Sequence, residues 1–195
     1  MAGGIRAWNG LVAAGPPEAG LAYFPATAAP GTLIALAWYL EAGSRAFYAG
    51  LAALAKDADT NGLFERLGRA EDGHLRTLTG LYRELGGVEA AAAFPQSVLP
   101  QHPADAVMEG GVEVEAALSW ARDRSRGDLL EYAVGLETNS WDLYLRMRRA
   151  VAGADAQRVF EVLAEEEKRH LEMLASLLGE TSGRDARPVG AGGSP

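Results

Sequence analysis

One pattern occurs twice in the sequence, and this internal repeat constrains the fold more than any other feature of the chain. When the chain is aligned with itself at an offset of 96 residues, Glu41 falls on Glu137 and Glu71 falls on Glu167, and no gap is needed. The same offset aligns the pairs Leu40 and Leu136, Ser44 and Ser140, Tyr48 and Tyr144, Phe64 and Phe160, Leu67 and Leu163, His74 and His170, Leu75 and Leu171, Leu78 and Leu174, and Leu81 and Leu177. Each half of the chain is therefore predicted to form the same two-helix unit.

The spacing of the apolar residues predicts two helices in each half. Leucine and phenylalanine residues recur at intervals of three and four, as they do on the buried face of an amphipathic helix. The predicted helices cover residues 30–56, 63–86, 127–151 and 156–178. Sequences rich in Asp, Asn, Gly and Ala, DADTNG at 57–62 and AGADAQ at 152–157, are predicted to turn the chain between the two helices of each half.

The segment that joins the two halves, residues 88–126, has a different character. Its prolines Pro95, Pro100 and Pro103 exclude a continuous helix, although residues 112–124 are predicted to form a short one. We therefore expect an all-α fold in which two αα hairpins are joined by a long crossover, which is the arrangement of a ferritin-like four-helix bundle.

This helical domain is expected to span residues 28–180. Residues 1–27, rich in Gly, Ala and Pro, are predicted to be an N-terminal extension, and the polar residues 181–195 a flexible tail. Gly and Pro interrupt the N-terminal residues before a secretory signal could form, so a cytoplasmic location is expected. The most apolar run, residues 32–55, carries Glu41 and Arg45 and is therefore interpreted as a core helix rather than a membrane span.

Composition narrows the chemistry that is available to the chain. The 195 residues include no cysteine, which excludes disulfides, thiolate metal sites, iron–sulfur clusters and cysteine nucleophiles. The net charge is −8, from 18 basic and 26 acidic residues, and no basic cluster stands out, so no nucleic-acid partner is expected. Any metal ion would have to be held by Glu, Asp and His.

Glutamate and histidine three residues apart on a helix lie on the same face, about 5 Å apart, and can reach one metal ion. The sequence contains this pair twice, as Glu71 with His74 and as Glu167 with His170. Glu41 and Glu137 stand alone in apolar stripes, and burying such a carboxylate without a partner would be costly. The antiparallel hairpins should place each of these two glutamates opposite one Glu-His pair, with four glutamates and two histidines in one core.

Three other residues, two glutamates beside Glu167 and one histidine in the crossover, are expected to lie outside this cluster. Glu165 and Glu166 precede Glu167 but do not match Glu71 in the repeat, so they are expected to be solvated. The third histidine of the chain, His102, is expected to be exposed in the crossover.

The sequences LEAGSRAFY with EDGH, and LETNSWDLY with EKRH, resemble the rubrerythrin-like branch of the ferritin-like di-iron carboxylate proteins over about residues 30–180. The resemblance implies two iron ions in the bundle, with manganese or a mixed pair of metals left open. It implies the ligands Glu41, Glu71, His74, Glu137, Glu167 and His170. Of these, Glu71 and Glu167 would bridge the two metal ions, and Glu41 and Glu137 would each bind one.

Tyr48 and Tyr144 follow the two terminal glutamates by seven residues on the same helix face. With Glu71 and Glu167 they complete the set of candidate catalytic residues. The tyrosines could donate a hydrogen bond to a ligand carboxylate or relay an electron. The alternative, that they simply fill the core, carries equal weight.

The sequence departs from the rubrerythrin pattern in two ways. Ser140 occupies the position where rubrerythrins proper carry a second glutamate on the third helix, which argues against the iron shift of the peroxidase cycle. The four cysteines of a rubredoxin domain are also missing, so an external electron donor is expected. Separately, AGGIRAWNGLVAAG resembles the closing segment of a rhodanese domain; the extension is either a remnant of such a domain, without the sulfur-carrying cysteine, or an ordinary extension.

The function expected from this resemblance is reduction of peroxide or O2 in defence against oxidative stress. One alternative is a ferroxidase or iron-handling protein, for which Fe(II) is the substrate. Another is a non-catalytic metal-binding module that works beside a rhodanese-like domain. A homodimer is the expected oligomeric state.

Overall fold

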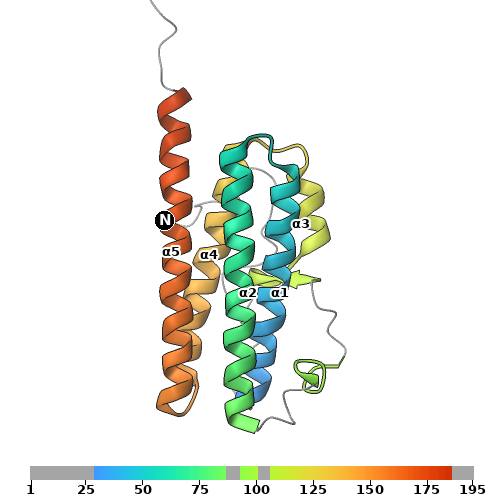
Figure 1. The fold of residues 1–195 in the computed structure, drawn as a ribbon, viewed down its shortest axis with the longest axis vertical. Coiled ribbons are helices and arrows are strands. Elements are labelled where there is room, and N and C mark those ends of the chain that lie inside the picture. The colour runs from blue at the N-terminus through green and yellow to red at the C-terminus, as the bar shows by residue number, and fades with distance from the viewer. Residues whose placement is uncertain (1–28, 87–92, 101–105, 186–195) are drawn as a thin grey trace, which may run out of the picture.

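The computed structural model describes residues 29–86, 93–100 and 106–185, and in this part of the chain the fold is all-α apart from one very short β-ribbon. The four long helices α1 (Pro30–Leu54), α2 (Ala58–Gly86), α4 (Arg126–Ala150) and α5 (Ala154–Asp185) run side by side (Figure 1). α1 packs along α2, α4 packs along α5, and α2 also contacts α5. The prediction of an all-α fold is therefore confirmed.

The turn between α1 and α2 is shorter than the sequence pattern suggested. Pro30 occupies the first turn of α1, where its missing N–H costs no hydrogen bond. α2 begins at Ala58, because the carboxylate of Asp57 accepts a hydrogen bond from the backbone N–H of Thr60 at 2.9 Å and caps the helix. Most of the segment 57–62, predicted to be a turn, is therefore the first turn of α2.

In the second pair of helices, α4 begins close to its predicted start, whereas α5 continues beyond its predicted end. Ser125 caps α4: its hydroxyl accepts from the Asp128 N–H, and the Asp128 carboxylate accepts from the Ser125 N–H, each at 3.1 Å. α5 continues past Leu178 to Asp185, so residues 181–185 are helical rather than part of a tail. The predicted N-terminal extension and residues 186–195 lie outside the described residues.

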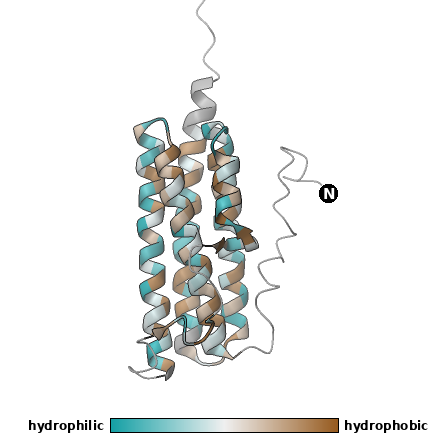
Figure 2. Cartoon of the chain, turned by 90° about the vertical axis from the view of Figure 1, so that its right-hand side faces the viewer, coloured by the Kyte–Doolittle hydropathy of each residue, from teal (hydrophilic) through white to brown (hydrophobic). Residues whose placement is uncertain are grey.

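The core consists of two hydrophobic clusters, one toward each end of the long helices. Along α1, residues of the first cluster end at Leu40 and those of the second begin at Phe47, with Glu41 between them. The same order of apolar, polar and apolar residues recurs on α2, α4 and α5. The long helices carry hydrophilic and hydrophobic residues along their length (Figure 2). A layer of buried polar side chains is thus enclosed between the two hydrophobic clusters.

The crossover contains the predicted short helix and a ribbon that was not predicted. The strands β1 (Val107–Met108) and β2 (Val112–Glu113) pair antiparallel around the 3-10 turn η4 (Glu109–Gly111), and α3 (Val114–Ala121) follows. β1 and α3 pack on α1, and η4 contacts both α1 and α4. The crossover therefore covers the side of the molecule where α1 and α4 face each other.

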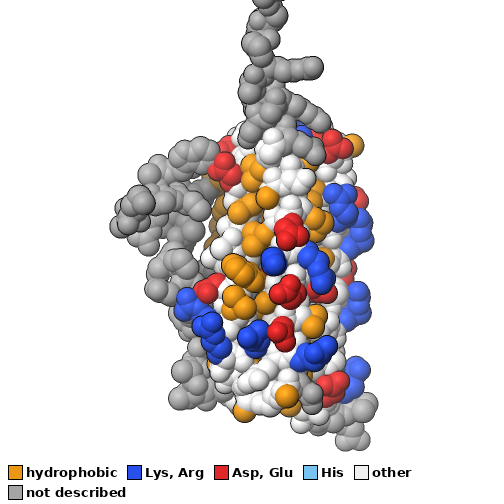
Figure 3. Space-filling model, turned by 90° about the vertical axis from the view of Figure 1, so that its left-hand side faces the viewer, with side chains coloured by type: hydrophobic (Ala, Val, Ile, Leu, Met, Phe, Trp, Pro, Cys, Tyr) orange, Lys and Arg blue, Asp and Glu red, His pale blue; other side chains and the backbone are white. Residues whose placement is uncertain are grey.

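Within the described ranges, no helix is both long enough and apolar enough to cross a membrane. On the face that Figure 3 displays, Lys and Arg side chains are interspersed with Asp and Glu side chains around a band of hydrophobic ones.

Candidate metal centre

The structure brings the six predicted ligands together in the polar layer between the two hydrophobic clusters. All six are buried, with 0 to 3% of their surface exposed. They form two groups in which one possible ligand atom from each residue lies within 4.8 Å of all the others. The first group is Glu41, Glu71, His74 and Glu167, and the second is Glu71, Glu137, Glu167 and His170. Each group could hold a metal ion, and Glu71 and Glu167 belong to both.

His74 directs one ring nitrogen at three carboxylates. Its Nδ1 lies 3.1 Å from Glu41 Oε2, 2.9 Å from Glu71 Oε2 and 3.2 Å from Glu167 Oε1. Of these three contacts, only the one with Glu41 has the alignment of a hydrogen bond. Three carboxylate oxygens thus surround one ring nitrogen, as they would if all four atoms were ligands of one metal ion.

His170 has the equivalent arrangement in the second half of the chain. Its Nδ1 lies 2.9 Å from Glu137 Oε2 and 3.1 Å from Glu167 Oε2. The rings of His74 and His170 stack with their centroids 5.5 Å apart, so the two groups are adjacent.

The carboxylates perturb one another strongly. Burial, and then the negative charge of Glu71, raise the pKa of Glu41 well above its usual range. Burial and the charge of Glu137 do the same to the pKa of Glu167. For Glu71, burial alone would raise the pKa, but the charge of His74 and the close contacts with Glu41 and His74 outweigh it, so the pKa falls to about 2. The cluster thus takes up protons that a bound metal ion would displace.

Burial alone would lower the pKa values of both histidines, but the surrounding carboxylates outweigh it. Glu41 and Glu71 raise the pKa of His74 well above its usual range, and Glu137 raises the pKa of His170. Both imidazoles are therefore stabilised in the charged form in this concentration of negative charge.

The chemistry of these donor atoms suits metal ions. Glu41 Oε1, Glu71 Oε2 and Glu167 Oε1 are buried and make no hydrogen bond to any described residue. Carboxylate oxygens and imidazole nitrogens suit iron and manganese, and each group supplies four such donors. Each group could therefore hold a metal ion, and the two groups share Glu71 and Glu167.

The two tyrosines that the repeat makes equivalent have different surroundings. Both are fully buried. The Tyr48 hydroxyl donates a hydrogen bond to Glu137 Oε1, on the other helix pair. The Tyr144 hydroxyl has no hydrogen-bond partner among the described residues, and its ring stacks on Phe160. Tyr48 thus contacts a candidate ligand, whereas Tyr144 packs in the core.

Glu166 differs from its expected solvated state. It is only 36% exposed, and its Oε2 lies 3.0 Å from His74 Nε2, although the contact lacks the alignment of a hydrogen bond. Contact with His74 lowers the pKa of Glu166. The residue that matches it in the first half is Ala70, so the repeat gave no signal for this contact. Glu165 is exposed as expected, and His102 lies outside the described residues.

One buried acidic residue near the site was not predicted from the sequence. Glu109, in the crossover turn η4, is 2% exposed, and neither of its carboxylate oxygens has a hydrogen-bond partner among the described residues. Its position falls between the repeated halves and has no repeat counterpart. The only local signal was an isolated glutamate between the apolar Val107-Met108 pair and the turn-forming Gly110-Gly111 pair.

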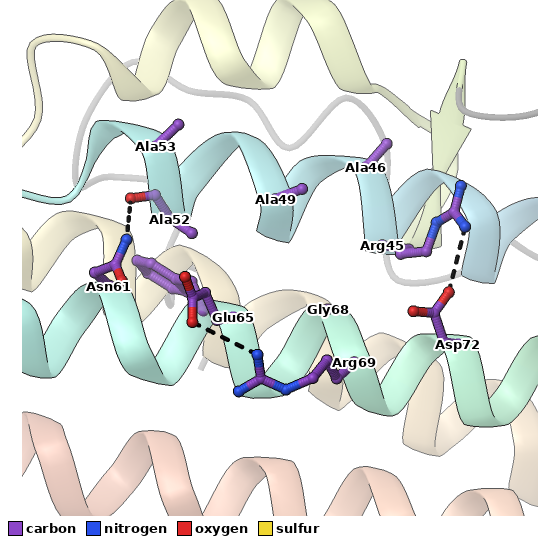
Figure 4. A pocket seen from close by; sticks show the side chains of 11 residues that line it. Arg45, Ala46, Ala49, Ala52, Ala53, Asn61, Glu65, Gly68, Arg69 and Asp72 are labelled. Carbon is purple, nitrogen blue, oxygen red and sulfur yellow. Dashed lines mark hydrogen bonds and ion pairs between the residues drawn. The ribbon is translucent and has the colours of Figure 1, made fainter.

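A groove lies between α1 and α2 on the outside of the bundle (Figure 4). Alanines of α1 line one wall, Gly68 lies on the other, and the Arg45–Asp72 ion pair at 3.3 Å closes one end. Phe64 also lines the groove, and it stacks on Tyr48 with the ring centroids 6.2 Å apart. None of the six candidate ligands lines it, so the groove is separate from the polar layer.

Comparison of the chain with protein-family models, with curated proteins and with solved structures finds no match. The resemblance to rubrerythrins therefore remains a prediction from the motifs, and the case for a metal centre depends on the geometry described above.

Proposed function

We propose that the chain is a ferritin-like bundle of two αα hairpins that functions as a di-iron carboxylate oxidoreductase of rubrerythrin type. One observation carries the proposal: two sets of four buried ligand residues share Glu71 and Glu167. One set alone would suit a mononuclear site. Two sets with a common pair of carboxylates suit two ions held side by side.

Charge balance supports two ions rather than one. Four ionised glutamates carry a charge of −4, and two divalent ions offset it, whereas one ion would leave two buried negative charges unbalanced. The two ions together would supply two electrons for the reduction of peroxide or O2. The all-oxygen and nitrogen donor set does not choose sharply between iron and manganese, so the identity of the metal belongs to the proposal.

The protein residues have distinct roles in this proposal. Glu71, Glu167 and the two histidines orient the ions, and Glu41 and Glu137 each complete one set. Tyr48 holds its proton against Glu137 and fixes the orientation of that carboxylate. The hydrophobic clusters on either side restrict the access of water to the site. Because the sequence contains no cysteine for a built-in iron–sulfur relay, the electrons come from an external donor.

The test begins with the apo protein, which is loaded with Fe(II) without oxygen and assayed for iron per chain. Peroxide or O2 is then added and the absorbance followed. We expect two irons per chain and stoichiometric oxidation that is faster with peroxide than with O2. Oxidation by O2 with continued uptake beyond two irons would favour the ferroxidase alternative.

Variants of one helix supply the control. Glu167→Gln removes a shared carboxylate, and we expect it to reduce the bound iron to one ion per chain or fewer. Glu165→Gln, on the exposed side of the same helix, should bind two irons as the wild type does. Failure of the wild type to bind metal, or two irons in Glu167→Gln, would contradict the proposal.

A further inference from the structure

One buried carboxylate, that of Glu109, has no role in the proposed function. It is as inaccessible as the six candidate ligands, with 2% of its surface exposed. Both of its oxygens lack a hydrogen-bond partner among the described residues. A buried carboxylate in that condition destabilises a fold strongly, unless a cation or a proton compensates it.

The backbone holds Glu109 against the polar layer. β1 packs on α1 so closely that a Cβ on Gly43 would overlap the carbonyl oxygen of Val107 and would lie 2.9 Å from Met108 Cα. Gly43 is two residues after Glu41, and its repeat counterpart is Asn139. The missing side chain at Gly43 therefore allows the backbone of β1 to lie close against α1.

Two neighbours of Glu109 fix the turn itself. The Met108 side chain is fully buried in the hydrophobic cluster that contains Phe47 and Tyr48. Gly111 closes the turn with φ of 70°, a conformation that favours glycine. With Met108 paired to Val112 across the ribbon, Glu109 is the first residue of a short, rigid loop. Its position is therefore defined by packing and is not that of a loose surface loop.

The contacts of η4 with α1 and α4 place Glu109 near the candidate metal centre, and it belongs to neither group of four ligand residues. After burial, the charges of Glu41 and Glu71 are the main causes that raise its pKa, and Glu137 adds to them. The charge of Glu109 also raises the pKa of Tyr48. The turn η4 contacts both α1 and α4, which carry Glu41 and Glu137. Glu109 thus enters the site from the side of α1 and α4, opposite the direct contact between α2 and α5.

We propose that Glu109 is a seventh protein ligand of the metal centre, delivered by the crossover to the side where α1 and α4 face each other. The inference rests on the proposed di-metal site but adds a residue that the repeat does not contain. Metal binding would satisfy the two oxygens that the protein leaves without a partner.

The test uses Co(II), whose visible absorption reports the number and geometry of its ligands. The wild type, Glu109→Gln and Glu113→Gln are titrated with Co(II), and the dissociation constants and absorption spectra are compared. We expect Glu109→Gln to weaken the binding of at least one Co(II) ion tenfold or more and to change the spectrum. Glu113→Gln, an exposed neighbour in the same ribbon, should match the wild type.

Thermal unfolding separates a ligand from a purely structural residue. If Glu109 is a ligand, Glu109→Gln replaces a buried ionisable carboxyl, whose burial opposes folding, with a neutral amide, so the apo variant should melt higher than the apo wild type and gain less from Co(II). A structural role would lower the melting temperature of the variant both with and without Co(II), and this result would overturn the inference. If Glu109→Gln does not fold, Glu109→Asp keeps the charge but shortens the side chain, and the same spectral change is expected.

The outcomes also distinguish this inference from the proposed function. If the wild type binds two Co(II) ions and Glu109→Gln binds them with the same affinity and spectrum, the di-metal site stands and the role of Glu109 is refuted. If the wild type binds no Co(II), both are refuted.

Discussion

At the scale of single residues, the two halves of the repeat share their ligands but not the surroundings of those ligands. Tyr48 donates to Glu137, whereas the hydroxyl of Tyr144 has no hydrogen-bond partner among the described residues. Glu166 contacts His74, whereas alanine occupies the matching position, Ala70. The two ions would therefore occupy unequal sites, although the sequence motifs are equal.

This inequality predicts different effects of the same substitution. Tyr48→Phe removes the donor to Glu137, and we expect metal affinity to fall about 10-fold to 100-fold, as for other residues that orient a ligand. Tyr144→Phe should leave metal affinity within about twofold of the wild type, because its hydroxyl orients no described ligand. Co(II) or Fe(II) titration of both variants tests this difference. Equal losses in the two variants would show that the tyrosines act alike.

At the scale of elements, the crossover determines how the two pairs of helices differ. Its ribbon packs against Gly43, and Leu118 of α3 packs against Gly50. The residues that match these glycines in the second half are Asn139 and Arg146, which carry side chains at these positions. The first helix of each pair therefore has the same ligand spacing but a different outer surface.

A methyl group on Gly43 should test the role of this packing. In Gly43→Ala the added Cβ collides with backbone atoms of Val107 and Met108, which cannot move aside as the end of a flexible side chain can. We expect a loss of stability of about 1–3 kcal/mol, as for other overpacked sites, and a weaker Co(II) site because Glu109 is displaced. Urea unfolding and Co(II) titration measure the two effects.

Gly135 provides the matched control for this prediction. It lies inside α4, and a Cβ there would meet nothing within 4 Å. Gly135→Ala should therefore stabilise the protein by about 0.5–1 kcal/mol through helix propensity alone. If Gly43→Ala were as stable as Gly135→Ala, the close approach of the crossover would not be a constraint on the fold.

At the scale of the whole molecule, the polar layer divides the hydrophobic core and opposes folding when no metal is bound. Four glutamates, two histidines and Glu109 are buried between two apolar clusters. The apolar layers must offset the cost of this charge, and metal binding would remove most of it. Stability is therefore expected to depend on both pH and metal.

The directions of the pKa shifts predict how the stability of the apo protein changes with pH. The pKa values of Glu41, Glu167, Glu109, His74 and His170 are all raised, so the folded apo protein holds more protons than the unfolded chain. The lowered pKa of Glu71 has its full stabilising effect above about pH 4.5 and does not change this sign at higher pH. The free energy of unfolding of the apo protein should then fall as the pH rises.

We accordingly expect the apo protein to melt at least about 3 °C lower at pH 8.5 than at pH 5.5, which corresponds to roughly 1 kcal/mol in a chain of this size. The histidine contribution is fully present below about pH 6.5 and is lost as the pH rises through the raised values. Differential scanning calorimetry across this range measures the change. A melting temperature that rises with pH would contradict the direction of the shifts.

Addition of metal should reverse this dependence. A metal ion at 100 times its dissociation constant stabilises a folded protein by about 2.7 kcal/mol per site. For a chain of this size, this corresponds to a rise in melting temperature of about 5–10 °C for each ion bound. The rise should be larger at pH 8.5 than at pH 5.5, because bound protons compete with the metal. Glu167→Gln should lose much of this gain, and calorimetry with and without metal provides the comparison.

The sequence by itself determined the features that depend on local spacing. Helical periodicity located the four long helices, and the offset of the repeat selected Glu167 from three consecutive glutamates. Residues three apart on one helix share a face in any fold, so the pairing of Glu71 with His74 needed no tertiary information. Helix ends were less well predicted, because Asp57 caps α2 several residues before its first core leucine.

Only the tertiary structure decided which residues from distant parts of the chain meet at the polar layer. Glu109 reaches it because the crossover packs on α1 at Gly43, and no local pattern specifies which face a connecting segment will cover. Tyr48 and Tyr144 have the same place in the repeat, but only one meets an acceptor, since the helices around them are not equivalent. Periodicity reports which face of a helix is buried, whereas the partner of a buried side chain is set by packing between segments far apart in the sequence.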